Sequence, residues 1–192
     1  MVADEECNYA GKILPTIRYT VKIQARCSLV EIVRLFDEMR FKGIYDSTTI
    51  VLVADHGTFA KAKGIKGSVD DDGNYAGNLD ARVISLAHPL MVIKLANEAG
   101  PLVTSSVYSS ITDTPATIAS ALHLDAAFSG RSILELAEGK SRLRRHYYYK
   151  HDDSQWNAEY LSLIQEFIVD GSVLDTGSWR LARKFYGKGA IE

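Results

Sequence analysis

Cysteine is scarce in this 192-residue sequence, which contains only Cys7 and Cys27. Their spacing matches neither a zinc knuckle nor a redox CxxC motif. The chain is therefore not a cysteine-based metal or redox protein. Two cysteines neither require nor exclude an oxidising compartment.

Long apolar runs are missing as well. No run reaches the roughly 18 residues that a membrane-spanning helix needs. The N-terminal MVADEECNY is acidic where a signal peptide would be apolar. We therefore expect the chain as given to be soluble.

Neither sign of charge dominates. Lysine and arginine number 22, aspartate and glutamate 24, and the formal net charge is -2, so no overall field favours nucleic acid or an anionic membrane. One exception is the basic and aromatic segment RLRRHYYYK at 142–150. It could bind single-stranded nucleic acid, but alternation along a strand equally gives a packed aromatic face and a solvated basic face. The slightly acidic chain favours the second interpretation, so we expect no nucleic-acid partner.

Apolar material is present in the usual amount. Hydrophobic residues make up 46% and charged residues 24% of the chain, as in an ordinary globular protein. The length suits one domain, or one domain with a small appendage.

A helix is predicted near the start of the chain. Ser28 and Glu31 have capping-box spacing, in which each side chain satisfies a backbone N–H. Apolar residues then recur at helical spacing, and Gly43 follows where a left-handed cap is expected. We expect a helix over Ser28–Lys42, with residues 19–25 either extending it backwards or forming a turn.

The central part of the chain predicts an α/β fold. Thr48–Val53 is β-branched and apolar on both faces, which is typical of a buried strand in a parallel sheet. Pro89–Leu95 resembles it, and Val103–Val107 is a weaker third strand. A helix over Pro115–Leu122 begins after Asp113, with proline in its first turn. We expect a mostly parallel sheet flanked by helices.

The tail has a different pattern. Leu143–Lys150 is strand-like, Leu163–Val169 is a further apolar run, and Asp170-Gly171 is a hairpin turn signal. Ser178–Phe185 adds a strand or a short helix. We expect a small antiparallel sheet here, and the predicted domains are 1–139 for the α/β core and 140–192 for the appendage.

Asp55-His56-Gly57 directly follows the first predicted strand, where open α/β sheets place their sites. An aspartate oxygen and an imidazole nitrogen suit Zn, Mn, Mg or Ca, although two ligands cannot close a site. Both can reach one ion only if the chain turns after Asp55, which the unusual backbone angles open to Gly57 would permit. The alternative is a strand end where Asp55 caps a turn and His56 is exposed.

Several longer motifs surround this tripeptide. RLFDEMRFKGIYDSTTIVLVADHG (34–57), HPLMVIK (88–94) and SITDTPATIASALHL (110–124) followed by FSGRSILEL (128–136) occur in the order of a sulfatase. Over roughly residues 20–140 the chain resembles the sulfatases of the alkaline phosphatase superfamily. IVDGSVLDTGSW (168–179) is similar to the C-terminal sheet of the lipoteichoic-acid-synthase and phosphoethanolamine-transferase branch.

The resemblance implies a partial alkaline-phosphatase-like fold and a divalent metal ion, with Asp55 and His56 as metal ligands. It also implies a lysine close to the transferred anion. Lys66 is the best candidate for this substrate-binding role, although lysines in such a loop are more often merely solvated.

Two further lysines and a histidine complete the candidates. Lys61 and Lys63 are alternatives to Lys66. His88 precedes the second predicted strand and could approach the substrate from the same sheet edge. A structural histidine, either hydrogen-bonded or exposed, is the other interpretation of His88 and the one that the sequence favours.

The nucleophile of these enzymes has no counterpart here. Sulfatases carry it in a Cys-x-Pro/Ala-x-Arg motif, whereas Cys7 precedes Asn-Tyr-Ala-Gly and Cys27 precedes Ser-Leu-Val-Glu. We therefore expect a fragment of a metal-dependent sulfatase or phosphotransferase/phosphodiesterase that is inactive in isolation. The parent would be membrane-anchored, periplasmic or extracellular.

Other functions stay open. The chain could be a non-catalytic sulfatase-like domain that binds anionic ligands or a partner protein, or a stand-alone binding domain with an incidental Asp-His-Gly. Because half of the implied fold is lacking, we expect self-association through the exposed sheet or the N-terminal segment.

Overall fold

A computed structural model of the chain describes residues 2–3, 7, 9–10, 17–58, 65–67, 79–149 and 163–186. Contacts between Cα atoms divide the chain into two compact units. Unit 1 comprises Met1–Ile50 and Lys94–Pro101, and unit 2 comprises Val51–Ile93 and Leu102–Glu192. Residues 102–139 and the tail thus belong to one unit.

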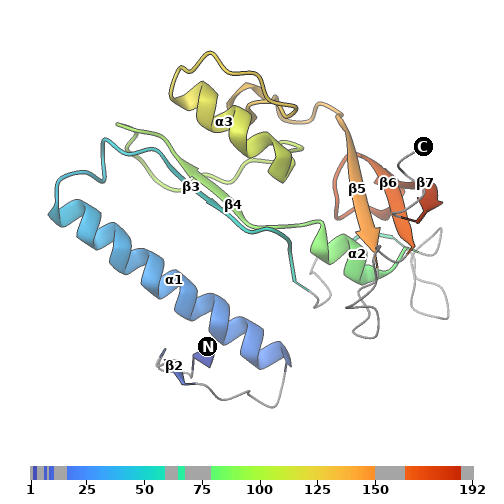
Figure 1. The fold of residues 1–192 in the computed structure, drawn as a ribbon, viewed down its shortest axis with the longest axis horizontal. Helices are drawn as coiled ribbons and strands as arrows, with labels where there is room; N and C mark the ends of the chain where they lie inside the picture. The colour runs from blue at the N-terminus through green and yellow to red at the C-terminus, as the bar shows by residue number, and fades with distance from the viewer. Residues whose placement is uncertain are drawn as a thin grey trace. The chain divides into compact units, whose positions relative to one another are not determined.

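Unit 1 is dominated by α1, a 25-residue helix over Ile17–Phe41 (Figure 1). It includes residues 19–25, as the predicted backward extension required, so Ser28 lies inside the helix and does not cap it. No glycine or proline occurs between Ile17 and Ser28, and nothing therefore interrupts the helix on that side. Gly43 follows the helix with φ of 69°, the left-handed conformation that the sequence predicted.

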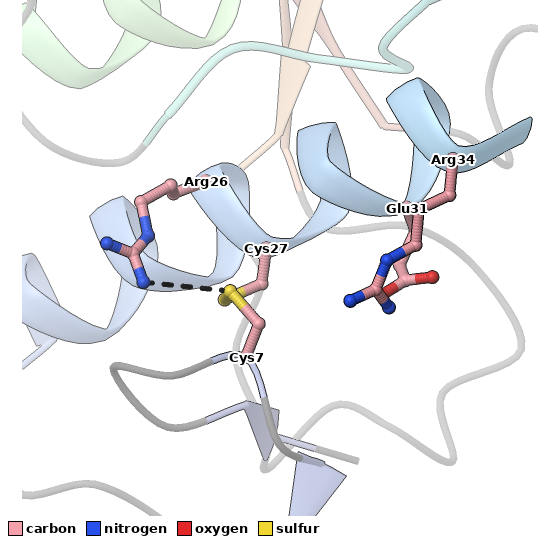
Figure 2. The surroundings of a disulfide bond; sticks show 5 residues. All are labelled: Cys7, Arg26, Cys27, Glu31 and Arg34. Atoms are coloured by element: carbon pink, nitrogen blue, oxygen red, sulfur yellow. Dashed lines mark hydrogen bonds and ion pairs between the residues drawn. A yellow bond between two sulfur atoms is a disulfide. The ribbon is translucent and has the colours of Figure 1, made fainter. Parts of the chain in front are cut away.

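A disulfide holds the N-terminal segment to α1. The strands β1 (Val2–Ala3) and β2 (Tyr9–Ala10) form a short antiparallel hairpin, and Cys7 lies between them. Its sulfur is bonded to that of Cys27 on α1 (Figure 2), a pairing that the sequence left open. The guanidinium of Arg26 lies 3.7 Å from the Cys7 sulfur.

The predicted apolar face of α1 is not fully covered. On the side of the disulfide, Ile23 and Cys27 are buried. On the predicted apolar side, Leu29 is 48% and Val33 53% exposed. The predicted helix is present, but its buried residues lie on the side of the disulfide and not on the predicted apolar side.

The strands β3 (Ile50–Val53) and β4 (Met91–Lys94) pair with each other (Figure 1). Two hydrogen bonds establish their direction: Asn97 N donates to Asp46 O, and Ala54 N donates to Leu90 O. Later residues on one strand therefore face earlier residues on the other, so the pair is antiparallel.

The expected parallel sheet is wrong, and with it the mostly parallel, alkaline-phosphatase-like α/β fold. The described strands form small sheets of two or three strands, and neighbouring strands in each sheet run antiparallel. Val53 is 39% exposed, so β3 is not buried on both faces. A short apolar run carries no information about the direction of its neighbour, and this ambiguity led to the error.

The third predicted strand is also wrong. Residues 101–110 have no regular structure, and Val103 is 78% exposed. The predicted helix after it is present as α3 (Thr114–Ala121), preceded by the 3-10 helix η1 (Ile111–Asp113). The cap lies earlier than predicted, because the Ser110 side chain caps η1.

Asp113 is the buried centre of this region. Its carboxylate accepts hydrogen bonds from both Nη atoms of Arg142, at 2.5 and 2.7 Å, and from the backbone N–H groups of Ser110 and Arg131. Burial alone would raise the pKa of Asp113, but the Arg142 guanidinium and the two amides hold it below its ordinary value. The network joins the start of α3 to the beginning of the tail.

The tail forms the antiparallel sheet that its pattern predicts. The strand order is β5 (Leu143–Tyr149), β6 (Ile164–Asp170), β7 (Trp179–Phe185). One face packs against α2 (Ala81–Leu86), a helix that the sequence analysis did not predict. The core comprises the buried residues Leu79, Val83, Ile84 and Phe167 and the half-buried Ile65, Ala81, Tyr148, Leu174 and Trp179.

The other face of this sheet carries a charged cluster. Glu166 is buried at the centre of the sheet, and its carboxylate accepts hydrogen bonds from Arg145 on β5 and Arg183 on β7. These bonds, led by that from Arg183, lower the pKa of Glu166 despite the opposing effect of burial. The remaining short helices are η2 (Ile133–Glu135) and η4 (Thr176–Ser178).

Candidate functional site

A cleft of about 990 Å³ lies within unit 2. Asp55 and His56 line it just beyond the end of β3. Further walls come from the turn at 86–89 between α2 and β4, the segment 105–112 that leads into η1, the edge strand β5 and residues 172–174 after β6. Residues that are distant in the sequence therefore meet at one cavity.

Asp55 and His56 both line this cleft, and their side chains lie close to each other. Asp55 Oδ1 accepts a hydrogen bond of 2.9 Å from the backbone N–H of His56, and Asp55 Oδ2 lies 3.8 Å from His56 Nε2. His56 Nδ1 lies 2.6 Å from the carbonyl oxygen of Gly57, which can only accept. In this contact Nδ1 therefore carries a proton. Metal-ligating histidines often donate one ring N–H to a carbonyl oxygen in this way.

Gly57 is required at this turn for a different reason than expected. Its backbone is not left-handed. Its N–H donates to Leu86 O at 2.8 Å, and a Cβ atom at this position would lie 1.9 Å from Ser85 O. Only glycine allows the chain after His56 to approach the end of α2 so closely.

The metal that the resemblance implies fits this site only in part. A complete shell needs about four to six donors, and Asp55 with His56 supplies two neighbouring side chains. Within the described ranges, no group of three or more His, Cys, Asp or Glu side chains could hold a metal ion. The Asp55 side chain is 88% exposed, so donors from elsewhere could approach it.

The candidate substrate-binding residues differ in position. His88 is exposed and lines the cleft. Lys66 is held through its backbone, since its N–H donates to Leu174 O and its carbonyl accepts from Thr176 N, and it is not among the described residues that line the cleft. Lys61 and Lys63 lie outside the described residues.

Sequence reasoning missed the role of β5 in this cleft. Exposure alternates along the strand, but each face carries both residue types: Arg145 and Tyr147 lie on the exposed face, and Arg144 and Tyr148 on the packed face. The expected separation into an aromatic and a basic face is therefore wrong. Because β5 is an edge strand, residues of both faces line the cavity.

Arginines outnumber carboxylates among the described residues that line the cleft. Arg82, Arg144 and Arg145 line it, whereas Asp55 is the one carboxylate among its described lining residues. The cluster of basic residues in the tail was the sequence signal that could have indicated this.

His146 forms part of the same wall. Its ring packs edge-on against Trp179, with 5.6 Å between the ring centroids. Burial lowers the pKa of His146 to about 4. Its Nε2 atom is buried and has no hydrogen-bond partner in the part of the chain that the structure describes.

Comparisons with protein-family models, curated proteins and solved structures found no match to this chain. The resemblance to sulfatases therefore stays a prediction from its motifs. Of the helices that the structure describes, none is long and apolar enough to cross a bilayer.

Proposed function

We propose that this chain forms part of the active site of a metal-dependent enzyme that hydrolyses or transfers sulfate or phosphate esters. It contributes two metal ligands, Asp55 and His56, and a cationic wall, but not the nucleophile. The observation that carries this proposal is the position of these two side chains in a cleft with three arginines and one carboxylate among its described lining residues.

The chemistry of the cleft suits such esters. Their non-bridging oxygens carry negative charge, which guanidinium groups bind through paired N–H donors. Ser109 and Ser110 line the same cavity, and a serine hydroxyl can donate one hydrogen bond. When bound, a divalent metal ion neutralises charge on the transferred group.

Metal binding by the chain tests this proposal. We expect weak binding of Mn²⁺, measured by water-proton relaxation, and its loss in Asp55→Ala and His56→Ala. The matched control is His123→Asn, because His123 is exposed, lies away from the cleft lining and has a left-handed backbone that asparagine tolerates. Unchanged Mn²⁺ binding in both cleft variants would refute the role of Asp55 and His56.

A catalytic test needs a parent protein that carries the nucleophile. There, His56→Ala should abolish most activity towards an aryl sulfate or a phosphodiester while the protein stays folded. Wild-type rates with wild-type metal content would contradict the proposal.

The disulfide supports a location outside the reducing cytosol. Disulfides persist in secreted and periplasmic proteins and are rare where glutathione keeps thiols reduced. We therefore propose an oxidising compartment for this domain. Protein trapped with a thiol-alkylating reagent at lysis should carry no label on Cys7 or Cys27 until it is reduced.

A second candidate function is a non-catalytic domain that binds anionic ligands. The same cationic wall favours it, since anion binding there needs no complete metal shell. Anion binding without any measurable Mn²⁺ binding would select this alternative.

A further inference from the structure

The arginines at the start of the tail differ in how their charges are compensated. Arg142 forms a bidentate ion pair with the buried Asp113. Arg145 is paired with Glu166, which also binds Arg183. These guanidinium groups therefore already have carboxylate partners.

Arg144 has none. Its Nη1 donates to Ser109 O at 3.4 Å and its Nη2 to Gly171 O, and the guanidinium lies over the Tyr108 ring, 5.2 Å from the centroid. Throughout the described ranges, no carboxylate forms an ion pair with it. Its Nε atom is buried and unpartnered.

The donors of Arg144 are not exhausted by these contacts. A guanidinium has five N–H groups, and two carbonyl oxygens accept from the Nη atoms of Arg144. One further Nη N–H on each side is left for a ligand. The two carbonyl bonds also hold the group in one orientation, which reduces the entropy lost on binding.

The environment of Arg144 makes an uncompensated charge costly. The side chain is partly buried in the cleft wall, and burial and the charge of Arg142 lower its pKa, although the charges of Tyr108, Asp113 and Asp170 act in the opposite direction. A partly desolvated cation without a carboxylate in direct contact raises the free energy of the fold. An anion in the cleft would supply the missing charge.

We propose that Arg144 is the anion-binding residue of the cleft and contacts the tetrahedral sulfate or phosphate group of the ligand. The inference rests on the proposed function for the identity of the cleft, but not on metal binding. Arg82 and Arg145 then play a smaller part, because Asp80 and Glu166 already compensate their charges.

Isothermal titration with inorganic sulfate and phosphate tests this role, in metal-free buffer at constant ionic strength. We expect millimolar binding by the wild-type chain and a loss of about tenfold or more in Arg144→Gln. Arg144→Lys should be intermediate, since lysine keeps the charge but lacks the planar donor pair. The matched control is Arg180→Gln, which removes an equal charge from an exposed position on β7 outside the cleft lining and should change binding by less than about twofold.

Arg144 also joins Ser109 to Gly171, so its removal could unfold the tail. A measurement on the wild-type chain avoids this ambiguity: phosphate should shift the NMR resonance of the Arg144 Nε–H and leave that of Arg180 in place. No shift at Arg144, equal losses in Arg144→Gln and Arg180→Gln, or no anion binding by the wild type would each overturn the proposal. Because the anion titrations contain no metal and the Mn²⁺ experiments no sulfate or phosphate, failure of the metal site and failure of the Arg144 site are distinguishable.

Discussion

The two units achieve their stability by different means. In unit 1 the described buried core is small, with Ile23 and Cys27 packed against Cys7 across a disulfide. In unit 2 an apolar cluster between α2 and the three-stranded sheet forms the core, with Phe167 at its centre. A covalent cross-link in one unit thus does what apolar burial does in the other.

The two units also differ in where their ion pairs lie. The ion pairs of α1, Glu31–Arg34 and Asp37–Arg40, are exposed and lie within one helical turn. In unit 2, Asp113 and Glu166 are buried carboxylates with arginine partners. Exposed pairs contribute little, whereas a buried carboxylate makes the fold depend on its partners.

The largest effect is expected from the core of unit 2. Phe167→Ala should destabilise that unit by about 3–5 kcal/mol, because it removes a buried ring and leaves a cavity. The control is Leu181→Ala, opposite Phe167 on β7 and 38% exposed, which should cost clearly less. Equal losses in urea denaturation would show that this cluster is not the main core.

In unit 1 the corresponding change is reduction of the disulfide. Cys7 and Cys27 are separated by 20 residues, and a loop of that size predicts a loss of about 3 kcal/mol. Native-state hydrogen exchange should show this loss in the amides of α1 and not in those of β6. An equal loss of protection in α1 and β6 would show that the two units unfold together.

Acid should weaken unit 2 before unit 1. Burial lowers the pKa of His146 from its ordinary value of 6.5 to about 4 in the folded chain. Between these two pH values the unfolded state binds more protons than the folded state. The free energy of unfolding therefore falls as the pH drops from about 6.5 towards 4. Roughly 2 kcal/mol should be lost between about pH 6.5 and 5, at about 1.4 kcal/mol per unit.

Urea denaturation at several pH values measures this slope. His146→Phe should remove it, whereas His88→Gln, at an exposed position, should preserve it. A slope that survives in His146→Phe would assign the acid sensitivity to other groups.

The smallest effect concerns the exposed pairs of α1. Arg34→Ala removes the pair with Glu31 and should cost no more than about 0.5 kcal/mol. Thermal unfolding of unit 1 checks this expectation. A loss of more than about 1 kcal/mol would mean that Arg34 has a role beyond this pair.

Some of the site could be predicted from the sequence. The predicted strand before Asp-His-Gly is present as β3, and Asp55 and His56 line the cavity just beyond it, while their binding of a metal stays a prediction. The position of the tail's arginines at that cavity could not be predicted in the same way, although their clustering is visible in the sequence. It depends on β5, about 90 residues further along the chain, being an edge strand.

The sequence by itself determined the local features of this protein. The cap at Gly43 and the positions of the three strands in the tail follow from local sequence patterns. Only the tertiary structure decided that β3 and β4 run antiparallel, that Cys7 bonds to Cys27, and that Arg144 alone among the arginines of the tail's first strand has no carboxylate partner. These features depend on contacts between residues that are far apart in the sequence. Burial, charge compensation and strand direction all arise from such contacts, so no local sequence pattern predicts them.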